Sequence, residues 1–387
     1  MPAVVIGAGQ AGLSASYHLT RLGIRHAVLD QDAAPGGAWR HRWDALTMRD
    51  VHGVAELPGS DPPPRTEARA NQAIPAYFAE YERAHGLPVV RPARVRLVRE
   101  AIPGDPHSPL VLEVAMPSGA DPGPIGAFRA PNGEPLSADA RFEVPARTIV
   151  NATGTWTRPF IPHYPGAETF RGEQFHTVDY PGPEHFRGKR TLVVGGGASA
   201  VQFLGALAPI TDTIWVTRRA PVWRTDDFTS TAGIEAVAMV ERRVAAGLPP
   251  ESVVSVTGLV LREQEREAER LGAYSARRPM FARILPDGAE WPDGSRERFD
   301  AILWATGFRP AISHLAPLRL RSEAGGIQLD RAGRGTGAAV DPRVQLVGYG
   351  PSASTIGANR AGRSAASGVR RYVEEHAPKV SAYTGGN

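Results

Sequence analysis

A glycine-rich turn between an apolar strand and a helix occurs twice in this chain, and it constrains the fold more than any other feature. The first copy is Gly7-x-Gly9-x-x-Gly12, preceded by the apolar run 3–6. Gly7 would permit the tight turn, Gly9 would let the backbone approach a pyrophosphate, and Gly12 would let the helix pack on the strand. Asp30 ends the next expected strand, where a carboxylate can accept hydrogen bonds from ribose hydroxyls. This context predicts a dinucleotide-binding unit; the alternative is a glycine-rich turn without a ligand.

The second copy, GGGASA at 195–200, differs from the first in two ways. Its third glycine is replaced by Ala200, and no acidic residue follows its second strand. Arg218 and Arg219 stand there instead, and an arginine suits a 2′-phosphate that a carboxylate would repel. The second unit therefore favours NADPH over NADH. The alternative is that these arginines are simply exposed.

The two units are separate, because most of the first half of the chain lies between them. An Ala-Thr-Gly motif after an apolar strand also occurs twice, at 152–154 and 305–307. The first unit has Asp30 after its second strand, and the second unit has Arg218 and Arg219 at the matching place. This difference suggests FAD in the first unit and NADPH in the second, with hydride passing from NADPH to the flavin. The predicted class is α/β, with two Rossmann-like dinucleotide-binding domains, the NADPH domain inserted into the FAD domain. The expected boundaries are 1–160 for the first part of the FAD domain, 161–304 for the NADPH domain with a helical insertion at about 224–290, and 305–387 for the C-terminal part of the FAD domain.

Periodicity suggests the remaining elements. Residues 71–86 have an apolar stripe typical of an amphipathic helix, and 87–150 are β-like. The Pro/Gly-rich stretch 103–135 is interpreted as a long surface loop or an extended hairpin. Helical periodicity with many charges covers 232–275, and 354–375 is expected to be one helix.

The composition excludes several kinds of chemistry. The 387 residues contain no cysteine, so disulfides, cysteine zinc sites, iron–sulfur clusters and thiol nucleophiles are excluded. The histidines show no ligand spacing, and no metal is expected. The formal net charge of +4 and the absence of a block of like charges give no indication of nucleic acid or a membrane surface. No apolar run reaches about 18 residues and no basic leader precedes the first strand, so the expectation is a cytoplasmic protein.

The motifs and their order resemble those of the class B flavoprotein monooxygenases. This family includes flavin-containing monooxygenases, N-hydroxylases, Baeyer–Villiger enzymes and the plant auxin-forming enzymes. The most specific match is Phe170-x-Gly172-x-x-x-His176-x-x-x-Tyr180, in the linker before the second nucleotide unit. The other motifs are GAGQAG at 7–12, GGAW at 36–39, NATGTWTRPFIP at 151–162, GGGASA at 195–200 and ATGFRP at 305–310.

The resemblance implies cofactor contacts along most of the chain. The first glycine turn and Asp30 would hold the FAD adenosine and pyrophosphate, and Gly37 and Trp39 would lie along the flavin. The arginine-tipped second turn would hold NADPH, and His176 and Tyr180 would tie the linker to the cofactor domains. The positions expected to bind the cofactors are Gly7, Gly9, Gln10, Ala11, Gly12, Asp30, Gly37, Ala38, Trp39, Thr153, Gly154, His176, Gly195, Gly197, Ala198, Ser199, Ala200, Arg218, Arg219, Thr306, Gly307, Thr355 and Ile356.

The resemblance also implies an activity. Reduced flavin would react with O2, and the resulting C4a-peroxyflavin, screened from water by bound NADP+, would oxygenate a soft heteroatom or a carbonyl of a small molecule. The fingerprint ends in Tyr180 where strict Baeyer–Villiger enzymes usually have tryptophan. The stretch 43–58 lacks the asparagine that N- and S-oxygenases often place near the flavin, and it is closer to the plant auxin-forming enzymes.

The candidates for the reaction itself are Arg49 and His52, which lie in the stretch that the resemblance places toward the flavin; which of them approaches C4a is open. Asn359 either reaches the active site or is a buried structural amide. The helix start near Thr355 and Ile356 either points at the flavin pyrimidine, where it would stabilise the charge of reduced flavin, or is a plain capped helix.

Two other functions use the same nucleotide sites. One is an NADPH-dependent flavin oxidase or reductase that produces peroxide or passes electrons to a partner; its disulfide-reductase form is excluded because there is no cysteine. The other is a flavin-binding sensor or scaffold, which would not need a hydride donor. The favoured partners are a small-molecule substrate and O2, and the sequence does not indicate an oligomeric state.

Overall fold

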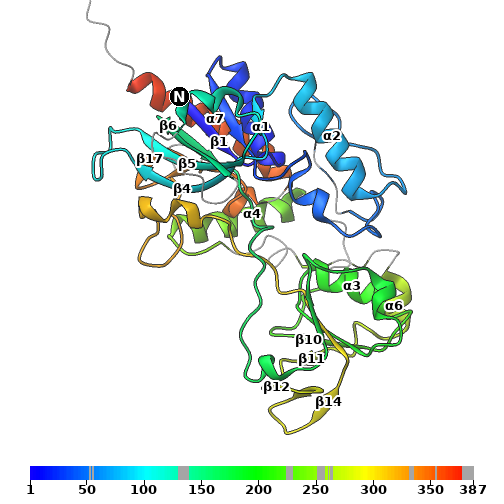
Figure 1. Cartoon of the computed structure of the whole chain (residues 1–387). Coiled ribbons are helices and arrows are strands. Elements are labelled where there is room, and N and C mark those ends of the chain that lie inside the picture. The colour runs from blue at the N-terminus through cyan, green and yellow to red at the C-terminus, as the bar shows by residue number, and fades with distance from the viewer. Residues whose placement is uncertain are drawn as a thin grey trace, which may run out of the picture.

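The computed structural model consists of two lobes (Figure 1). One lobe is formed by the two ends of the chain and the other by its middle. Within the described part of the chain, no helix combines the length and apolar character needed to cross a membrane. The structure describes residues 1–51, 54, 56–129, 139–223, 230–250, 258, 259, 261, 265–330, 335–353 and 355–376, without the side chains of 230–237, 355 and 356.

The first lobe is built on a six-stranded sheet in the order β16-β17-β7-β1-β2-β3. All neighbouring strands are parallel except the pair β16–β17. The central strands are continuous apolar runs because helices and a second sheet cover both faces. The bounds are β1 Ala3–Ile6, β2 His26–Leu29, β3 Val89–Val90, β7 Thr148–Asn151, β16 Gly337–Ala338 and β17 Asp341–Leu346.

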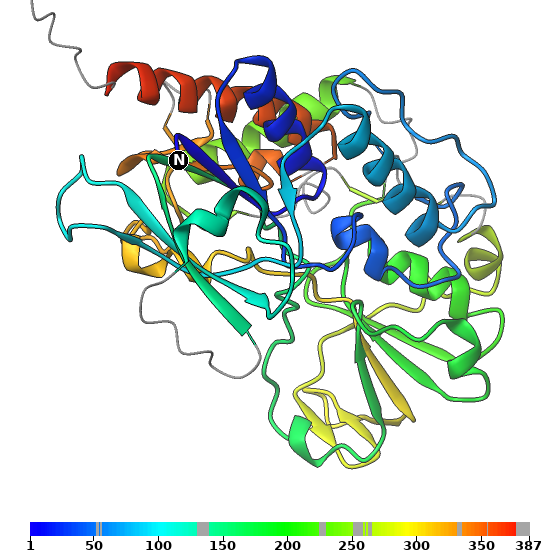
Figure 2. The same cartoon turned by 45° about the horizontal axis from the view of Figure 1, so that its top comes forward.

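Helices α1 (Gln10–Arg21) and α7 (Thr355–Glu375) lie side by side against one face of this sheet (Figure 2). The two helices approach closely because small residues face each other. A Cβ added at Gly362 would lie 2.3 Å from Ser14 Oγ and 2.8 Å from the Ala15 nitrogen. Helix α2 (Ala70–Ala84) confirms the expected amphipathic helix, with Ile74, Phe78 and Tyr81 among its buried residues.

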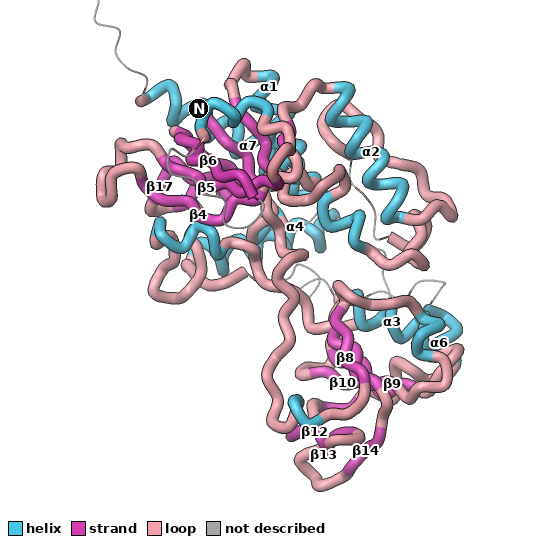
Figure 3. The backbone as a smooth tube through the Cα atoms, viewed as in Figure 1, coloured by secondary structure: helices cyan, strands magenta, loops and turns pink. Residues whose placement is uncertain are grey.

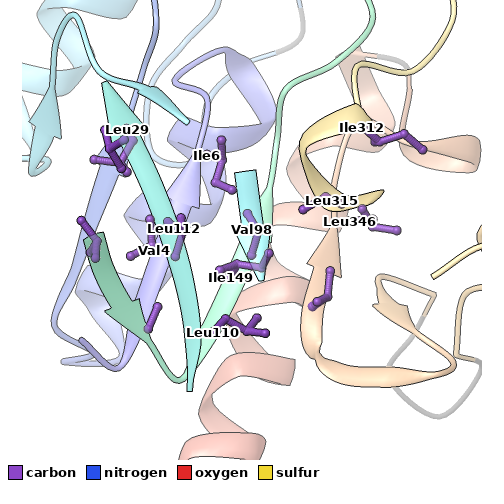
Figure 4. Packing of buried hydrophobic residues seen from close by; sticks show 14 of the residues in the cluster. Val4, Ile6, Leu29, Val98, Leu110, Leu112, Ile149, Ile312, Leu315 and Leu346 are labelled. Atoms are coloured by element: carbon purple, nitrogen blue, oxygen red, sulfur yellow. The ribbon is translucent and has the colours of Figure 1, made fainter. Parts of the chain in front are cut away.

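A three-stranded antiparallel sheet, β4-β5-β6, covers the other face. Side chains such as Val98, Leu110 and Leu112 pack there against Val4 and Ile149 of the first sheet (Figure 4). The bounds are β4 Arg94–Glu100, β5 Leu110–Pro117 and β6 Asp139–Ala146.

This sheet corrects the interpretation of 103–135. A long surface loop is wrong, because β5 and the short helix η2 (Gly123–Phe128) fall in this stretch, and most of β5 is buried. The extended-hairpin alternative is confirmed for the β4–β5 pair. The prolines and glycines that suggested a loop lie mostly outside the strand, and residues 130–138 lie outside the described residues.

The second lobe contains a five-stranded parallel sheet in the order β11-β10-β9-β15-β8. Helix α3 (Ala198–Leu207) follows β9, as the second glycine turn predicts. A small antiparallel sheet, β12-β13-β14, completes the lobe. The bounds are β8 Glu173–His176, β9 Thr191–Val194, β10 Thr213–Thr217, β11 Arg278–Pro279, β12 Arg283–Leu285, β13 Gly288–Glu290, β14 Arg296–Arg298 and β15 Ala301–Trp304.

The expected helical insertion is helical only in part. It contains α4 (Ser230–Ala245) and the short α6 (Arg266–Arg270), but the three short strands β11, β12 and β13 lie between residues 278 and 290. Helix α4 packs on the first lobe, where Val240 and Val244 join the core beneath the six-stranded sheet (Figure 1). The chain therefore leaves the second lobe after β10 and returns to it for α6.

Candidate cofactor sites and active site

The three glycines of the first turn have different environments. Gly7 has φ +99°, and a Cβ there would lie 2.7 Å from the Ala152 oxygen. A Cβ at Gly12 would lie 1.9 Å from the Gly7 oxygen, so this position is closed by backbone. At Gly9, no atom lies within 4 Å of an added Cβ. The open side of Gly9 is what close approach of a pyrophosphate requires, whereas Gly7 and Gly12 serve the local packing.

The start of α1 and the GGAW segment lie together beside this turn. Helix α1 begins at Gln10, with Gly9 as its N-cap and no acidic residue in its first turn. A Cβ at Gly37 would lie 3.0 Å from Gly9 Cα, so the short helix η1 (Gly37–His41), which carries Ala38 and Trp39, begins against the turn. The start of α1 is suitable for binding a phosphate, because the first N–H groups of a helix have no partner within the helix and the helix dipole is positive at this end.

Asp30 lies at the carboxyl end of β2 and is 5% exposed. Its Oδ2 accepts a hydrogen bond from Arg91 Nε at 3.0 Å. Arg91 also donates to both carboxylate oxygens of Glu82, at 2.6 and 2.7 Å. Burial raises the pKa of Asp30, and the Arg91 charge opposes this rise. The expected ribose acceptor is therefore held in place by an arginine that no sequence motif singles out.

The second glycine turn, 195–200, repeats the geometry of the first glycine turn, with alanine in place of the third glycine. Gly195 has φ +143°, and a Cβ there would lie 2.2 Å from the Ala305 oxygen. Gly197 has open space around an added Cβ, and it caps α3, which begins with Ala198 and Ser199. The position equivalent to Gly12 holds Ala200, whose methyl group is fully buried in the core of this lobe.

Three arginines gather at the carboxyl end of β10. Arg218 and Arg219 are exposed there, as the sequence motif requires for a ligand contact. The hydroxyl of Thr217 donates to the Arg219 oxygen at 2.7 Å and accepts from Arg277 Nη1 at 3.1 Å. Arg277 is not predictable from the sequence, because it comes from a distant segment and belongs to no motif.

Figure 3 shows loop segments that run between the two lobes, and each Ala-Thr-Gly motif lies at the start of one such segment. The Phe160 N–H donates to the Gly307 oxygen at 3.0 Å, and the Ala311 N–H donates to the Gly154 oxygen at 2.9 Å. The Thr153 hydroxyl donates to the Ala311 oxygen at 2.7 Å. The Thr306 hydroxyl likewise donates to the backbone of the other crossing. The crossings 152–162 and 305–311, here called the hinge, are therefore hydrogen-bonded to each other.

A half-buried histidine, His314, is hydrogen-bonded close to the hinge. His314 Nε2 is 2.7 Å from Asn151 Oδ1, and the Asn151 amide donates to Thr153 Oγ1 at 3.1 Å. Burial lowers the pKa of His314 to about 4. The ring is therefore neutral at pH 7 and belongs to the network that holds the first Ala-Thr-Gly motif.

The aromatic fingerprint is not in a linker, which corrects the sequence interpretation: its central residues form β8, an edge strand of the second sheet. Phe170 is in the core, and a Cβ at Gly172 would lie 2.2 Å from the Asp300 oxygen. His176 Nε2 donates to the Gly307 oxygen at 3.0 Å. Burial lowers the pKa of His176, although this hydrogen bond opposes the change. The fingerprint thus attaches the edge strand to the hinge.

Trp43 connects the two lobes beside the fingerprint tyrosine. Its ring centre lies 5.6 Å from that of Tyr180 and 5.4 Å from that of Phe203, both in the second lobe. It also packs against the core of the first lobe. Trp43 was not predicted as a site residue, although its position four residues after Trp39 is a signal in the sequence.

The structure places the catalytic candidates apart from one another. Arg49 is 68% exposed and forms an ion pair with Glu67. His52 lies outside the described residues. The amide of Asn359, in the second turn of α7, donates to the Glu56 oxygen, and its Oδ1 is buried without a partner among the described residues. Thr355 and Ile356 begin α7, but their side chains lie outside the description.

Two glycine turns, each between a parallel strand and a helix start, define a protein with two dinucleotide-binding units. Comparisons with known proteins agree. A model of the flavin-binding monooxygenase-like family matches residues 143–256, and a model of the NAD(P)-binding Rossmann-like domain matches residues 5–55. The solved flavin-containing monooxygenase from Stenotrophomonas maltophilia is 33% identical, with a TM-score of 0.75 over 96% of this chain and 98% of that chain.

Curated relatives with similar sequences are also monooxygenases by name. An indole-3-pyruvate monooxygenase of Oryza sativa subsp. japonica is 27% identical over 344 residues, which cover 80% of this chain and 77% of the relative. A Baeyer-Villiger monooxygenase of Streptomyces coelicolor is 28% identical over 227 residues, 57% of this chain and 38% of the relative. The chain belongs to the flavin-containing monooxygenase family, the class B flavoprotein monooxygenases, and is an oxidoreductase.

Proposed function

We propose that the protein binds FAD at the first glycine turn and NADPH at the second, and that it oxygenates a small organic molecule. Residues 1–160 and 305–387 would form the FAD domain, and 161–304 the NADPH domain. The open sides of Gly9 and Gly197, each at a helix start, fit two pyrophosphates. The exposed Arg218 and Arg219, with Arg277 beside them, fit a 2′-phosphate.

The observation that carries this proposal is the pairing of the two Ala-Thr-Gly segments in the hinge. Each segment follows the carboxyl end of a central parallel strand, β7 or β15, which is the edge where dinucleotides bind in such sheets. Since the segments are hydrogen-bonded to each other, the two cofactor sites face a common region. Hydride transfer between two bound cofactors requires this proximity.

Bound FAD would supply the oxidising chemistry: reduced by NADPH, it would react with O2 to a C4a-peroxyflavin that transfers one oxygen atom to the substrate and leaves the other as water. The chain's own contribution is to bind, to orient and to exclude water. Trp39, Trp43 and Trp156 are partly buried around the junction of the lobes and would keep water from it. The relatives named for indole-3-pyruvate and for Baeyer–Villiger oxidation favour a carbonyl compound as the substrate.

Stopped-flow spectroscopy tests this function. The purified protein should be yellow, and NADPH should bleach it without oxygen. Mixing the reduced, NADP+-bound protein with O2 should then give a persistent peroxyflavin band before oxidised flavin returns. Immediate return of oxidised flavin, with one peroxide formed per NADPH whatever substrate is offered, would support the oxidase or reductase alternative instead.

Replacement of one arginine tests the nucleotide preference. Arg219→Ala should raise the KM for NADPH by about 10- to 100-fold, because a charge-assisted hydrogen bond to the 2′-phosphate is lost. The KM for NADH, which lacks this phosphate, should change less than about threefold. Steady-state NADPH and NADH oxidation by the same preparation gives both values, and equal effects would contradict the assignment.

A further inference from the structure

Arg42 is a half-buried arginine without an anionic partner among the described residues. Its guanidinium carbon lies 4.3 Å from the ring centre of Trp156 and 5.5 Å from that of Trp39. Its Nε is buried, and no hydrogen-bond partner for it exists in the described part of the chain. Burial lowers the pKa of Arg42 to about 10, so the group is still charged at pH 7.

Two arginines with largely buried side chains, Arg91 and Arg343, show how this chain compensates such a charge. Arg91 and Arg343 have side chains that are 11% and 3% exposed. A buried cation without a counter-charge is unfavourable by several kcal/mol, which is why such groups are paired. Arg42 departs from this pattern, because no carboxylate of the described residues forms an ion pair with it. The paired carboxylates are Asp30 and Glu82 for Arg91, and Asp341 and Glu100 for Arg343.

The position of Arg42 indicates what its missing partner is. Trp156 follows the first Ala-Thr-Gly motif and stacks on Phe308, which follows the second, with 5.2 Å between ring centres. Trp43, which follows Arg42 in the sequence, contacts Tyr180 of the second lobe. Arg42 therefore lies at the junction of the lobes, beside the hinge. The phosphates of both cofactors have other proposed partners, at the glycine turns and at the arginines after β10.

We propose that Arg42 binds the carboxylate of the substrate, so that the enzyme acts on organic acids; this rests on the proposed function. A guanidinium stacked against indole faces keeps its in-plane N–H groups directed away from the rings, where they can form two parallel hydrogen bonds to a carboxylate. Trp39 and Trp156 would contact the apolar part of the same molecule. The substrate class is therefore an aromatic or otherwise apolar carboxylic acid.

Isothermal titration of the holoenzyme with FAD and NADP+ bound tests this proposal. The probes are two matched pairs: phenylacetate with phenylacetamide, and 3-(phenylthio)propanoate with its amide. We expect the wild-type enzyme to bind each acid at least about tenfold more tightly than its amide, because the amide cannot form the charge-assisted pair. In Arg42→Met this preference should vanish, whereas Arg42→Lys should keep part of it. Arg83→Met is the matched control: it removes an exposed arginine, paired with Glu80 on α2, and should keep the preference.

Three results would overturn the proposal: no preference for acids in the wild-type enzyme, an unchanged preference in Arg42→Met, or a tenfold weaker binding of FAD or NADP+ in Arg42→Met and Arg42→Lys. The last result would assign the arginine to a cofactor phosphate. If Arg42→Met does not fold, Arg42→Lys decides, since it retains the charge but not the planar fork. A protein that shows the arginine-dependent preference but yields only peroxide would refute the proposed function and leave this site standing.

Discussion

At the residue scale, glycines in equivalent sequence patterns serve different physical purposes. Gly12 has no room for a methyl group, because the Gly7 oxygen lies 1.9 Å from its virtual Cβ. Ala200 occupies the matching position in the second lobe with its methyl group in the core. Gly9 has open space on that side. Glycine is therefore required for packing at position 12, whereas the open space at position 9 fits the proposed approach of a ligand.

Paired substitutions separate these two requirements. Gly12→Ala should lower the free energy of unfolding of the FAD-free protein by about 3 kcal/mol, because the new methyl group overlaps backbone that cannot move away easily. Gly9→Ala should leave unfolding almost unchanged but weaken FAD binding by at least about tenfold. Urea denaturation and FAD titration measure the two effects. If Gly9→Ala destabilised the fold as much as Gly12→Ala, the distinction would be wrong.

The half-buried His314 predicts a pH dependence of the free energy of unfolding. Its pKa is about 4 in the fold and near 6.5 in an unfolded chain, so between these values the unfolded state binds more protons. Stability should therefore decrease as the pH falls, by at most about 2 kcal/mol between pH 7 and pH 5 from this residue. Urea denaturation of His314→Gln should show a correspondingly smaller decrease. An identical pH dependence in wild type and variant would exclude this origin.

At the element scale, the contact between α1 and α7 depends on small residues. A methyl group at Gly362 would meet the backbone of α1, whereas one at Gly205 of α3 would meet its nearest atom, Glu265 Cγ, at 3.1 Å. The first contact requires the helices to separate, and the second only a small shift of a side chain.

The two glycines give a matched prediction. Gly362→Ala should lower the free energy of unfolding by about 1–3 kcal/mol despite the better helix propensity of alanine, because the helix pair must open. Gly205→Ala should be close to neutral, since the propensity gain offsets the tight contact. Thermal or urea unfolding provides the comparison, and equal effects of the two changes would show that the helix contact is adaptable.

Local patterns in the sequence predicted the elements better than their pairing. Both strand–turn–helix units, the strands before the Ala-Thr-Gly motifs and helices α2 and α7 are confirmed. Strand β5 was predicted only as one of two alternatives because prolines and glycines surround it. Strand β8 was missed because a motif that crosses an edge strand resembles a linker. Of the candidate site, the glycines could be predicted since their role is local. Arg91 and Arg277 could not, because their importance arises only from partners distant in the sequence.

At the scale of the whole molecule, the two lobes are connected by the hinge, by Trp43 and by α4. Trp43 packs against the core of both lobes, and its closest ring contacts are in the second. The rate of hydride transfer depends steeply on the distance between the reacting atoms. The contacts between the lobes should therefore affect flavin reduction more than the binding of either cofactor.

Trp43→Leu tests this coupling. We expect the rate of anaerobic flavin reduction by saturating NADPH to fall by about 10-fold or more, with Kd values for FAD and NADP+ changed less than threefold. Stopped-flow reduction and equilibrium titration measure these quantities. Trp223→Leu is the control, since Trp223 has its aromatic contacts with Trp215 and Tyr274 inside the second lobe. Similar losses in both variants would mean that the effect is not specific to the junction.

The docking of α4 on the first lobe has a consequence for dissecting or recombining this enzyme. A fragment cut at 161–304 would carry away the helix that supplies Val240 and Val244 to the other core. The rest of the chain would expose the apolar surface that α4 normally covers, and fragment 161–304 would expose the apolar face of α4. We therefore expect both parts to aggregate. Chimeras that exchange residues 161–304 with those of a homologue must therefore transfer this helix together with the surface that receives it, or keep both from the same parent.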